Sequence, residues 1–165
     1  AGDFAFYVRE GRLIENGKAD ADGLNALEDP GALRRDAETV VTPHGGEFSR
    51  LTGTAPSPAA AAALARDGGV TVLLKGNPTF VVDGDETWVI TSGGSELATI
   101  GTGDVLTGMT AAFLAGGLPG LVAARSAAYH HGAAGRRMAD VETVTATRLA
   151  GEVARGIATS GLEYT

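Results

Sequence analysis

The stretch of this chain best suited to chemistry is Gly-Thr-Gly-Asp at 101–104, which stands directly before an apolar segment with a helical pattern. The first backbone N–H groups of a helix have no partners inside it, and the helix dipole is positive at that end. Gly101 and Gly103 leave the backbone open to close approach, and Thr102 can add a hydroxyl donor. These features predict a binding site for a phosphate group.

Asp104 completes this motif, and its carboxylate has two possible roles. In the first turn of a helix a carboxylate is stabilised by the dipole, so a capping role is available. Beside a phosphate, the same carboxylate can accept the proton of a hydroxyl that attacks phosphorus, as a general base does in phosphoryl transfer. Both interpretations stay open, because one short glycine motif is weak evidence and no Gly-Lys-Ser/Thr follows as in a Walker loop.

The overall composition excludes several classes of protein. The 165 residues are 44% hydrophobic and 20% charged, which suits one modest domain spanning 1–165 with its own core. A net charge of −7 argues against nucleic-acid binding but permits a small anion held by backbone N–H groups. The absence of cysteine excludes disulfides and thiolate metal sites. With no apolar run near the roughly 20 residues that cross a bilayer and no signal-peptide core, we expect a cytoplasmic protein without a membrane partner.

Strands and helices are expected to alternate ahead of the glycine motif. The clearest helix signal is at 57–69, where Ser57 suits the N-cap, Pro58 the first helical position and Gly68–Gly69 the end. The nearly continuous apolar run at 70–76 is typical of a buried parallel strand. The other elements expected here are a strand at 4–8, a loop from 11 into a short helix at 24–27, a strand at 38–42, a turn at 43–46, a helical turn at 47–51 ending at Gly53, and a hairpin at 79–90 around Asp83-Gly84-Asp85.

Helices are expected to fill the rest of the chain after a polar, glycine-rich loop at 91–101. Their predicted ranges are 104–115, 121–139 and 147–158. Alternating strands and helices followed by helices favour an α/β fold with a mostly parallel sheet.

Four blocks of the sequence resemble, in the same order, the ADP/ATP-dependent NAD(P)H-hydrate dehydratases of the ribokinase-like superfamily. They are DADGLNAL at 20–27, VVTPHGGEFSRLTG at 40–53, VTVLLKGNPTFVVDG at 70–84 and LATIGTGDVLTGMTAAFLAGG at 97–117. The Thr-Pro-His-x-Gly-Glu-Phe segment is the most specific, because sugar and vitamin kinases of the same fold lack it. The resemblance implies a ribokinase-like fold, with a central, mostly parallel sheet flanked by helices.

The resemblance also implies a reaction. Such enzymes are lyases of metabolite repair: they dehydrate the S epimer of hydrated NADH or NADPH, with ADP or ATP as phosphoryl donor. The ring hydroxyl is phosphorylated, and phosphate leaves as the double bond forms again. Magnesium is expected with the nucleotide because it neutralises the transferring charge. By the same resemblance we expect a homo-oligomer.

Site residues carry over from the family position by position. Asp104 matches the aspartate that contacts the substrate and serves as base, and His44 matches the histidine that contacts the hydrated nicotinamide. Glu47 is expected to help organise phosphate or magnesium, and Lys75 to neutralise phosphate charge. The positions expected to contact the nucleotide are Lys75, Gly76, Asn77, Pro78, Thr79, Gly101, Thr102 and Gly103.

Structural interpretations stand beside these roles. Lys75 can be a solvated lysine at a strand end, His44 a turn residue that donates to the backbone, and Glu47 a charge that complements a helix dipole. His130 and His131 lie on an expected helix without spaced carboxylates, so we interpret both as structural. The hairpin around Trp88 is expected to pack on itself, although it can also cover a base.

The sequence departs from the family in its first part. Members are usually much longer, and the DADGLN block should follow a buried apolar strand, whereas RLIENGK is too polar for a central strand. We therefore expect a fold that is partial or truncated, and a chain of low stability on its own. Two other functions stay open: a vitamin-precursor or sugar kinase of the same superfamily, and a nucleotide-binding subunit without catalysis.

Overall fold

A computed structural model describes residues 6–9, 12–15, 33–34 and 36–159. In this part of the chain a six-stranded sheet has the order β2-β1-β3-β4-β5-β6. The strands are β1 (Phe6–Arg9), β2 (Arg12–Glu15), β3 (Thr39–Val41), β4 (Thr71–Leu74), β5 (Thr79–Asp83) and β6 (Glu86–Ile90). The helices are α2 (Gly45–Thr52), α3 (Pro58–Gly68), the 3₁₀ turn η2 (Ser95–Leu97), α4 (Thr102–Ala115), α5 (Gly120–Ala139) and α6 (Ala146–Thr159).

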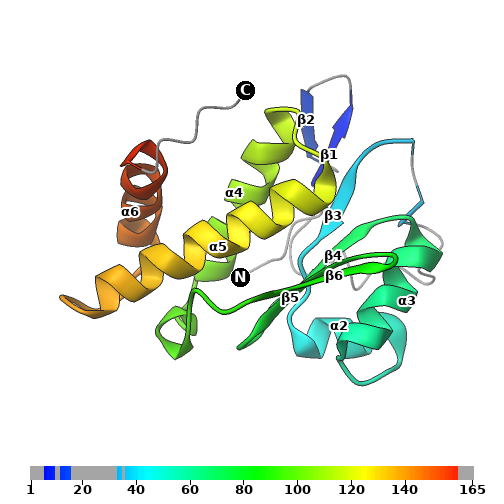
Figure 1. Cartoon of the computed structure of the whole chain (residues 1–165), viewed down its shortest axis with the longest axis horizontal. Coiled ribbons are helices and arrows are strands. Elements are labelled where there is room, and N and C mark those ends of the chain that lie inside the picture. Colours follow the sequence, from blue (N-terminus) through cyan, green and yellow to red (C-terminus); the bar gives the residue numbers. More distant parts are fainter. Residues whose placement is uncertain (1–5, 10–11, 16–32, 35, 160–165) are drawn as a thin grey trace.

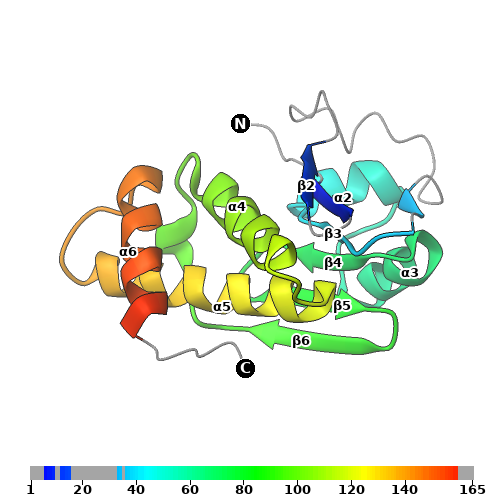
Figure 2. The ribbon, with the colours of Figure 1, turned by 90° about the horizontal axis from the view of Figure 1, so that it is seen from above.

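Helices cover both faces of the sheet, which confirms the α/β prediction (Figures 1 and 2). Alternate residues of the strands point to opposite faces. Val41 and Val72 therefore pack with α2 and α3, whereas Val40 and Leu73 pack with α4 and α5. Helix α6 adds a smaller cluster against α4 and α5. Each fully buried valine or leucine contributes about 1.5–3 kcal/mol, so these two layers fix the positions of the strand ends.

The sheet is mixed, and the prediction of a mostly parallel sheet is wrong for the described strands. Only β3 and β4 pair in parallel among them, with Val40 opposite Thr71. The pairs β1–β2, β1–β3, β4–β5 and β5–β6 are all antiparallel. For β1–β2, β4–β5 and β5–β6 the physical reason is the short connections, since a tight turn reverses the chain whereas a parallel pair needs a long crossover.

Helix α3 and the hairpin follow the sequence signals closely. The Ser57 hydroxyl accepts the Ala60 N–H at 3.1 Å, Pro58 begins the helix, and Gly69 ends it with a φ of +62°. In the hairpin, Asp83 pairs with Glu86 and Gly84 has a φ of +56°, so a two-residue turn joins β5 and β6.

Other boundaries differ from the prediction. Residues Arg12–Glu15 form β2 instead of a loop; a strand at the edge of a sheet tolerates polar residues because only one side needs a partner. Helix α2 begins at Gly45 rather than 47, and α4 begins at Thr102 rather than 104. The short helix expected at 24–27 lies outside the described residues. None of the described helices is both long and apolar enough to cross a membrane.

Candidate functional site

A cavity of about 540 Å³ opens where the carboxyl ends of β3 and β4 meet the first turn of α4. Ligands of open α/β sheets bind at this end of the strands. The loop before α4 and the middle of α5 form the rest of the wall. The lining residues are His44, Lys75, Gly76, Asn77, Thr79, Ile90, Ser92, Gly93, Gly94, Ser95, Leu97, Ala98, Thr99, Ile100, Thr102, Gly103, Leu106, Ala128, His131 and Gly132.

The parallel pairing of β3 and β4 continues past the two strands and brings His44 beside Lys75. The Lys75 N–H donates to the Pro43 carbonyl at 2.8 Å, and His44 and Lys75 form a parallel bridge. Two residues that are 31 positions apart in the sequence therefore lie side by side at the cavity.

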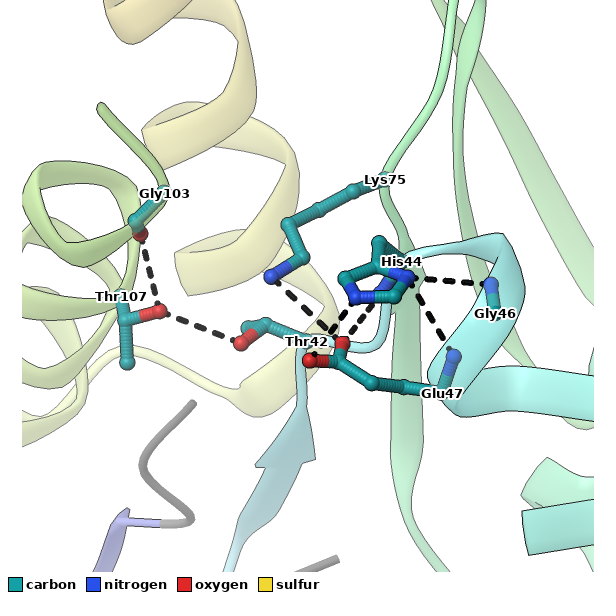
Figure 3. A network of polar contacts seen from close by, with 7 residues as sticks. All are labelled: Thr42, His44, Gly46, Glu47, Lys75, Gly103 and Thr107. Atoms are coloured by element: carbon teal, nitrogen blue, oxygen red, sulfur yellow. Dashed lines mark hydrogen bonds and ion pairs between the residues drawn. The ribbon is translucent and has the colours of Figure 1, made fainter. Parts of the chain in front are cut away.

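His44 caps helix α2 with one ring nitrogen and contacts Glu47 with the other (Figure 3). Its Nδ1 accepts the N–H groups of Gly46 at 3.0 Å and Glu47 at 3.3 Å, while its Nε2 lies 3.1 Å from Glu47 Oε1. Because Nδ1 accepts, the proton of the neutral ring is on Nε2 and points to the carboxylate. The prediction of a turn at 43–46 missed this cap, since histidine is not among the preferred N-cap residues.

Glu47 is a buried carboxylate that joins His44 to Lys75. It is 6% exposed, and its Oε2 accepts the His44 backbone N–H at 2.7 Å, which completes a capping box. The same oxygen lies 3.8 Å from Lys75 Nζ. The structure therefore shows the predicted helix-terminal charge, and in addition a partner for the lysine.

The Lys75 ammonium lies beside the first turn of α4. A Cβ atom placed on Gly103 would be 3.7 Å from Lys75 Nζ, which is ordinary contact distance. The side chain is mostly buried, with 17% of its surface exposed. The interpretation of Lys75 as a solvated strand-end lysine is wrong, because its side chain is mostly buried in the cavity wall and its charge has Glu47 as a partner.

Helix α4 begins with two backbone donors that have no acceptor in the described part of the chain. Gly101 is the N-cap, with a φ of +85°, and offers no side chain. The Thr102 N–H donates to Thr99, and the Val105 N–H closes the first helical turn on Gly101. Between these, the N–H groups of Gly103 and Asp104 have no acceptor among the described residues, so this turn is suited to an anion.

Thr102 does not offer the hydroxyl donor that the sequence suggests. Its side chain is 3% exposed, and its Oγ1 donates within its own loop, 2.6 Å from the Leu97 carbonyl and 2.7 Å from the Thr99 carbonyl. A hydroxyl has one proton, so it cannot also donate to a phosphate. The role of Thr102 in the described structure is to shape the loop before α4.

Two side chains, Thr107 from α4 itself and His131 from α5, hold the carbonyl groups of this first turn. Thr107 Oγ1 donates to the Gly103 carbonyl at 3.0 Å and is itself 3.1 Å from Thr42 Oγ1, at the end of β3 (Figure 3). His131 Nε2, from α5, lies 2.8 Å from the Thr102 carbonyl. Burial lowers the pKa of His131, and its hydrogen bond to Thr102 opposes that shift only in part.

The predicted site residues separate into two groups. Seven of them line the cavity: His44, Lys75, Gly76, Asn77, Thr79, Thr102 and Gly103. Pro78 follows a cis peptide bond within the 76–79 loop, Gly101 shapes the helix start, and neither lines the cavity. Asp104 also lies outside the lining; its carboxylate is exposed in the first turn of α4 and has no partner among the described residues.

The wall that α5 supplies was not predicted from the sequence. A Cβ atom on Gly132 would come within 2.5 Å of the Gly93 nitrogen, so the helix packs directly against the backbone of the 91–101 loop. His131, interpreted as purely structural, also lines the cavity. Trp88 does not line it; the indole is 40% exposed, under Arg125, whose guanidinium carbon is 4.5 Å from the ring centroid.

The cavity lining thus combines groups suited to an anion with apolar surface. Lys75 and the N–H groups at the start of α4 are the groups suited to an anion, while Ile90, Leu97 and Ala128 contribute apolar surface. A molecule with a phosphate at one end and a flat heterocycle at the other matches this combination.

Solved structures with the same arrangement define the class of protein. The structure has a TM-score of 0.65 to a ribokinase-like superfamily protein from Enterococcus faecalis, at 28% identity over 73% of this chain and 44% of that one. To an ADP/ATP-dependent NAD(P)H-hydrate dehydratase from Bacillus subtilis, co-crystallised with ATP and Mg²⁺, the TM-score is 0.71 at 31% identity, over 76% of this chain and 49% of that one. The fold is therefore ribokinase-like, as expected from the sequence.

Sequence comparison narrows the class to one family. The chain is 40% identical to the ADP-dependent (S)-NAD(P)H-hydrate dehydratase of Neisseria meningitidis over 146 residues, 82% of this chain and 49% of that protein. It is 42% identical to the bifunctional NAD(P)H-hydrate repair enzyme of Mycobacterium leprae over 118 residues, 68% of this chain and 25% of that protein. The NAD(P)H-hydrate dehydratase family model matches residues 18–155, and the chain belongs to this family. The chain thus spans at most about half the length of these relatives.

Proposed function

We propose that this chain binds an adenine nucleotide and dehydrates the S epimer of hydrated NADH or NADPH, with ADP or ATP as phosphoryl donor. The observation that carries the proposal is the start of α4, where the free N–H groups of Gly103 and Asp104 meet the Lys75 ammonium. The family membership supports the same reaction, a lyase reaction of metabolite repair. Relatives described as ADP-dependent favour ADP as the donor.

In the proposed complex the terminal phosphate of the nucleotide lies on the first turn of α4. Its charge is balanced by the N–H groups, the helix dipole and Lys75. The Gly76–Thr79 loop lies beside the nucleotide, and the Thr79 hydroxyl already closes this loop on the Gly76 carbonyl at 2.9 Å. The substrate approaches from the side of Asp104 and His44, and both ring nitrogens of His44 already have partners in α2.

Asp104 is the proposed general base. The ring hydroxyl of the hydrate attacks the terminal phosphorus, its proton passes to the Asp104 carboxylate, and the bond from phosphorus to the leaving nucleotide oxygen breaks. The phosphate then leaves the ring with the C–O electron pair while the neighbouring carbon loses a proton to solvent, which forms the double bond. The absence of a partner for Asp104 within the described residues leaves its carboxylate available for this proton.

Magnesium fits this site as a companion of the nucleotide. The described residues contain no group of three His, Asp or Glu side chains that could hold a metal ion. Both oxygens of Glu47 already contact His44, and one of them also contacts Lys75, so Glu47 organises the phosphate site through the lysine. Mg²⁺ commonly binds through substrate phosphates and water with few protein ligands, and there it would neutralise the charge of the transferring group.

A coupled assay tests the proposed reaction. Hydrated NADH incubated with the protein, ADP and Mg²⁺ should regain the absorbance of reduced nicotinamide, and omission of the nucleotide should abolish the gain. ATP in place of ADP ranks the two donors, and hydrated NADPH compares the two substrates. The expected cytoplasmic location and homo-oligomer remain proposals beside this one, and light scattering measures the oligomeric state.

Two results would assign the site to one of the alternatives. If calorimetry shows nucleotide binding while the absorbance does not return, the chain acts as a nucleotide-binding subunit. If a vitamin precursor or sugar becomes phosphorylated instead, the chain is a small-molecule kinase. This assay is motivated by the similarity of the fold to a hydroxyethylthiazole kinase from Pyrococcus horikoshii, with a TM-score of 0.62.

A further inference from the structure

The hydrogen bond from His131 to Thr102 lies at a point where it can control the anion site. His131 is 6% exposed and reaches from α5 to the Thr102 carbonyl oxygen, 2.8 Å from its Nε2. A carbonyl oxygen only accepts hydrogen bonds, so the imidazole proton is on Nε2. Burial lowers the pKa of His131, which favours this neutral, donating ring at physiological pH.

The Thr102 carbonyl and the Gly103 N–H belong to one peptide unit. A trans peptide is planar, and its C=O and N–H groups point in opposite directions. Thr102 lies in the first turn of α4, so the helix already sets the direction of this peptide unit. The His131 hydrogen bond to the carbonyl reinforces that direction and, with it, the direction of the Gly103 N–H, one of the two donors without an acceptor in the described chain. The bond also polarises the peptide, because hydrogen bonds in a chain strengthen one another.

The second free donor is held in the same way. The Asp104 N–H shares a peptide unit with the Gly103 carbonyl, which accepts from Thr107, with Thr42 behind it. Each donor at the α4 terminus is thus supported through the carbonyl of its own peptide unit. His131 of α5 binds the carbonyl of the first unit, and Thr107 of α4, which contacts Thr42 at the end of β3, binds the carbonyl of the second. His131 is the side chain that connects the α5 wall of the cavity to the N–H groups at the start of α4, where we propose that a phosphate binds.

We propose that His131 is a positioning residue of the anion site, which aims and polarises the Gly103 N–H through the Thr102–Gly103 peptide unit. This inference rests on the proposed nucleotide site. It assigns to His131 a role in affinity for the terminal phosphate, beyond the packing of α5 against α4. A residue that only packs would affect every ligand of the cavity alike.

Two variants separate the donor from the volume of the side chain. His131→Met keeps the bulk and removes the donor, whereas His131→Gln offers an amide N–H at a similar reach. His130→Gln, the neighbouring half-buried histidine, is the matched control. Calorimetry with ADP and with AMP gives the test, since AMP lacks the terminal phosphate of ADP.

His131→Met is expected to weaken ADP binding about 3- to 10-fold, the range of one lost hydrogen bond, with AMP binding unchanged. His131→Gln should recover most of the ADP affinity, and His130→Gln should equal the original protein. Equal losses for ADP and AMP, or no loss in a folded His131→Met protein, would overturn the positioning role while the nucleotide site stands. No ADP binding by the original protein would instead overturn the proposed function and, with it, this inference.

Nuclear magnetic resonance of the unmodified protein tests the inference without a variant. A long-range ¹H–¹⁵N spectrum should place the His131 proton on Nε2, and ADP should move this proton downfield together with the Gly103 amide proton. A proton on Nδ1, or a Gly103 amide that responds to ADP while the His131 proton does not, would contradict it. This measurement also decides the matter if His131→Met does not fold.

Discussion

At the scale of single residues, the site differs from the sequence expectation mainly in which atoms are free. His44 and Thr102 lie at the cavity, as the resemblance implied, but their polar atoms are already bonded to α2 and to the loop before α4. Asp104 shows the reverse: it lies outside the cavity lining, and its carboxylate has no partner in the described chain. Free functional groups, rather than residue types, therefore identify the chemistry here.

The base role of Asp104 predicts a loss of turnover without a loss of nucleotide. Asp104→Asn removes the proton acceptor and is expected to lower kcat by about 10²- to 10⁴-fold. ADP affinity should stay equal or rise slightly, because one negative charge beside the phosphate disappears. The coupled assay and calorimetry measure the two effects, with Asp140→Asn at the end of α5 as a control. Full activity in Asp104→Asn would remove the base assignment.

The position of Lys75 predicts a charge effect on phosphate binding. Lys75→Gln keeps a donor but removes the ammonium beside α4, so ADP affinity should fall about 10- to 100-fold. The fall should shrink at high salt, because ionic screening weakens the lost attraction. Arg66→Gln, which makes the same charge change near the β5–β6 turn, should leave the affinity unchanged. A salt-independent loss, or a similar loss in both variants, would count against the lysine as a phosphate ligand.

At the scale of elements, the cavity depends on how closely α5 approaches the loop at 91–101. Gly132 allows this approach, and Arg136 reinforces it with hydrogen bonds to the carbonyls of Thr91 at 3.2 Å and Gly93 at 3.5 Å. The loop in turn positions Gly101 and the start of α4. A change in the spacing between α5 and the loop should therefore reach the nucleotide site.

Gly132→Ala tests this packing. The added methyl group would overlap the backbone at Gly93, so α5 or the loop must move, at a cost of about 1–3 kcal/mol in the free energy of unfolding. ADP affinity should fall as well. Gly151→Ala, on an exposed position of α6 with nothing within 4 Å, should stabilise the protein by about 0.5–1 kcal/mol. Denaturant titration measures both values, and a neutral or stabilising Gly132→Ala would show that the contact is loose.

At the scale of the whole molecule, the acidic balance governs how stability responds to pH. The net charge of −7 includes acidic groups that gather at the end of the β5–β6 hairpin. Burial raises the pKa of Asp83, and the nearby charges of Glu38 and Glu86 raise it further. A raised carboxyl pKa means that the folded state resists ionisation, so this group destabilises the fold as the pH rises through its pKa.

Asp83→Asn should therefore stabilise the protein at neutral pH, by no more than about 0.5 kcal/mol because the side chain is exposed. The gain should vanish at acidic pH, where Asp83 is protonated in both the folded and the unfolded state. Asp85→Asn, next in the turn, removes an ion pair with Arg66 instead and should give no gain. Melting temperatures from pH 3 to 8 measure both variants, and a gain that persists below the pKa would exclude charge repulsion as its cause.

The sequence expectation of low stability for the chain alone stays a prediction. Within the described residues the sheet ends at β2 and β6, and Trp88 and Val89 on β6 are exposed. Edge strands with apolar surface are sites of association. A single cooperative unfolding transition of a monomer, at a concentration-independent midpoint, would contradict the expectation.

The sequence alone determined the features that depend on neighbours along the chain. Ser57, Pro58 and Gly69 define α3, the Asp83–Glu86 turn defines the hairpin, and the glycines at 101 and 103 define an open helix start, because capping and turn conformations are local properties. The resemblance to the family likewise named seven of the twenty residues that line the cavity.

Only the tertiary structure decided which polar atoms remain available. The pairing of β3 with β4 brought His44, Glu47 and Lys75 together, and the packing of α5 on α4 placed His131 against Thr102. No local pattern encodes such contacts, because they join residues 28 to 31 positions apart through buried layers on both sides of the sheet. A polar group that is hydrogen-bonded across those layers is no longer available to a ligand. A group without an acceptor in the described chain, such as the Gly103 N–H, can bind one.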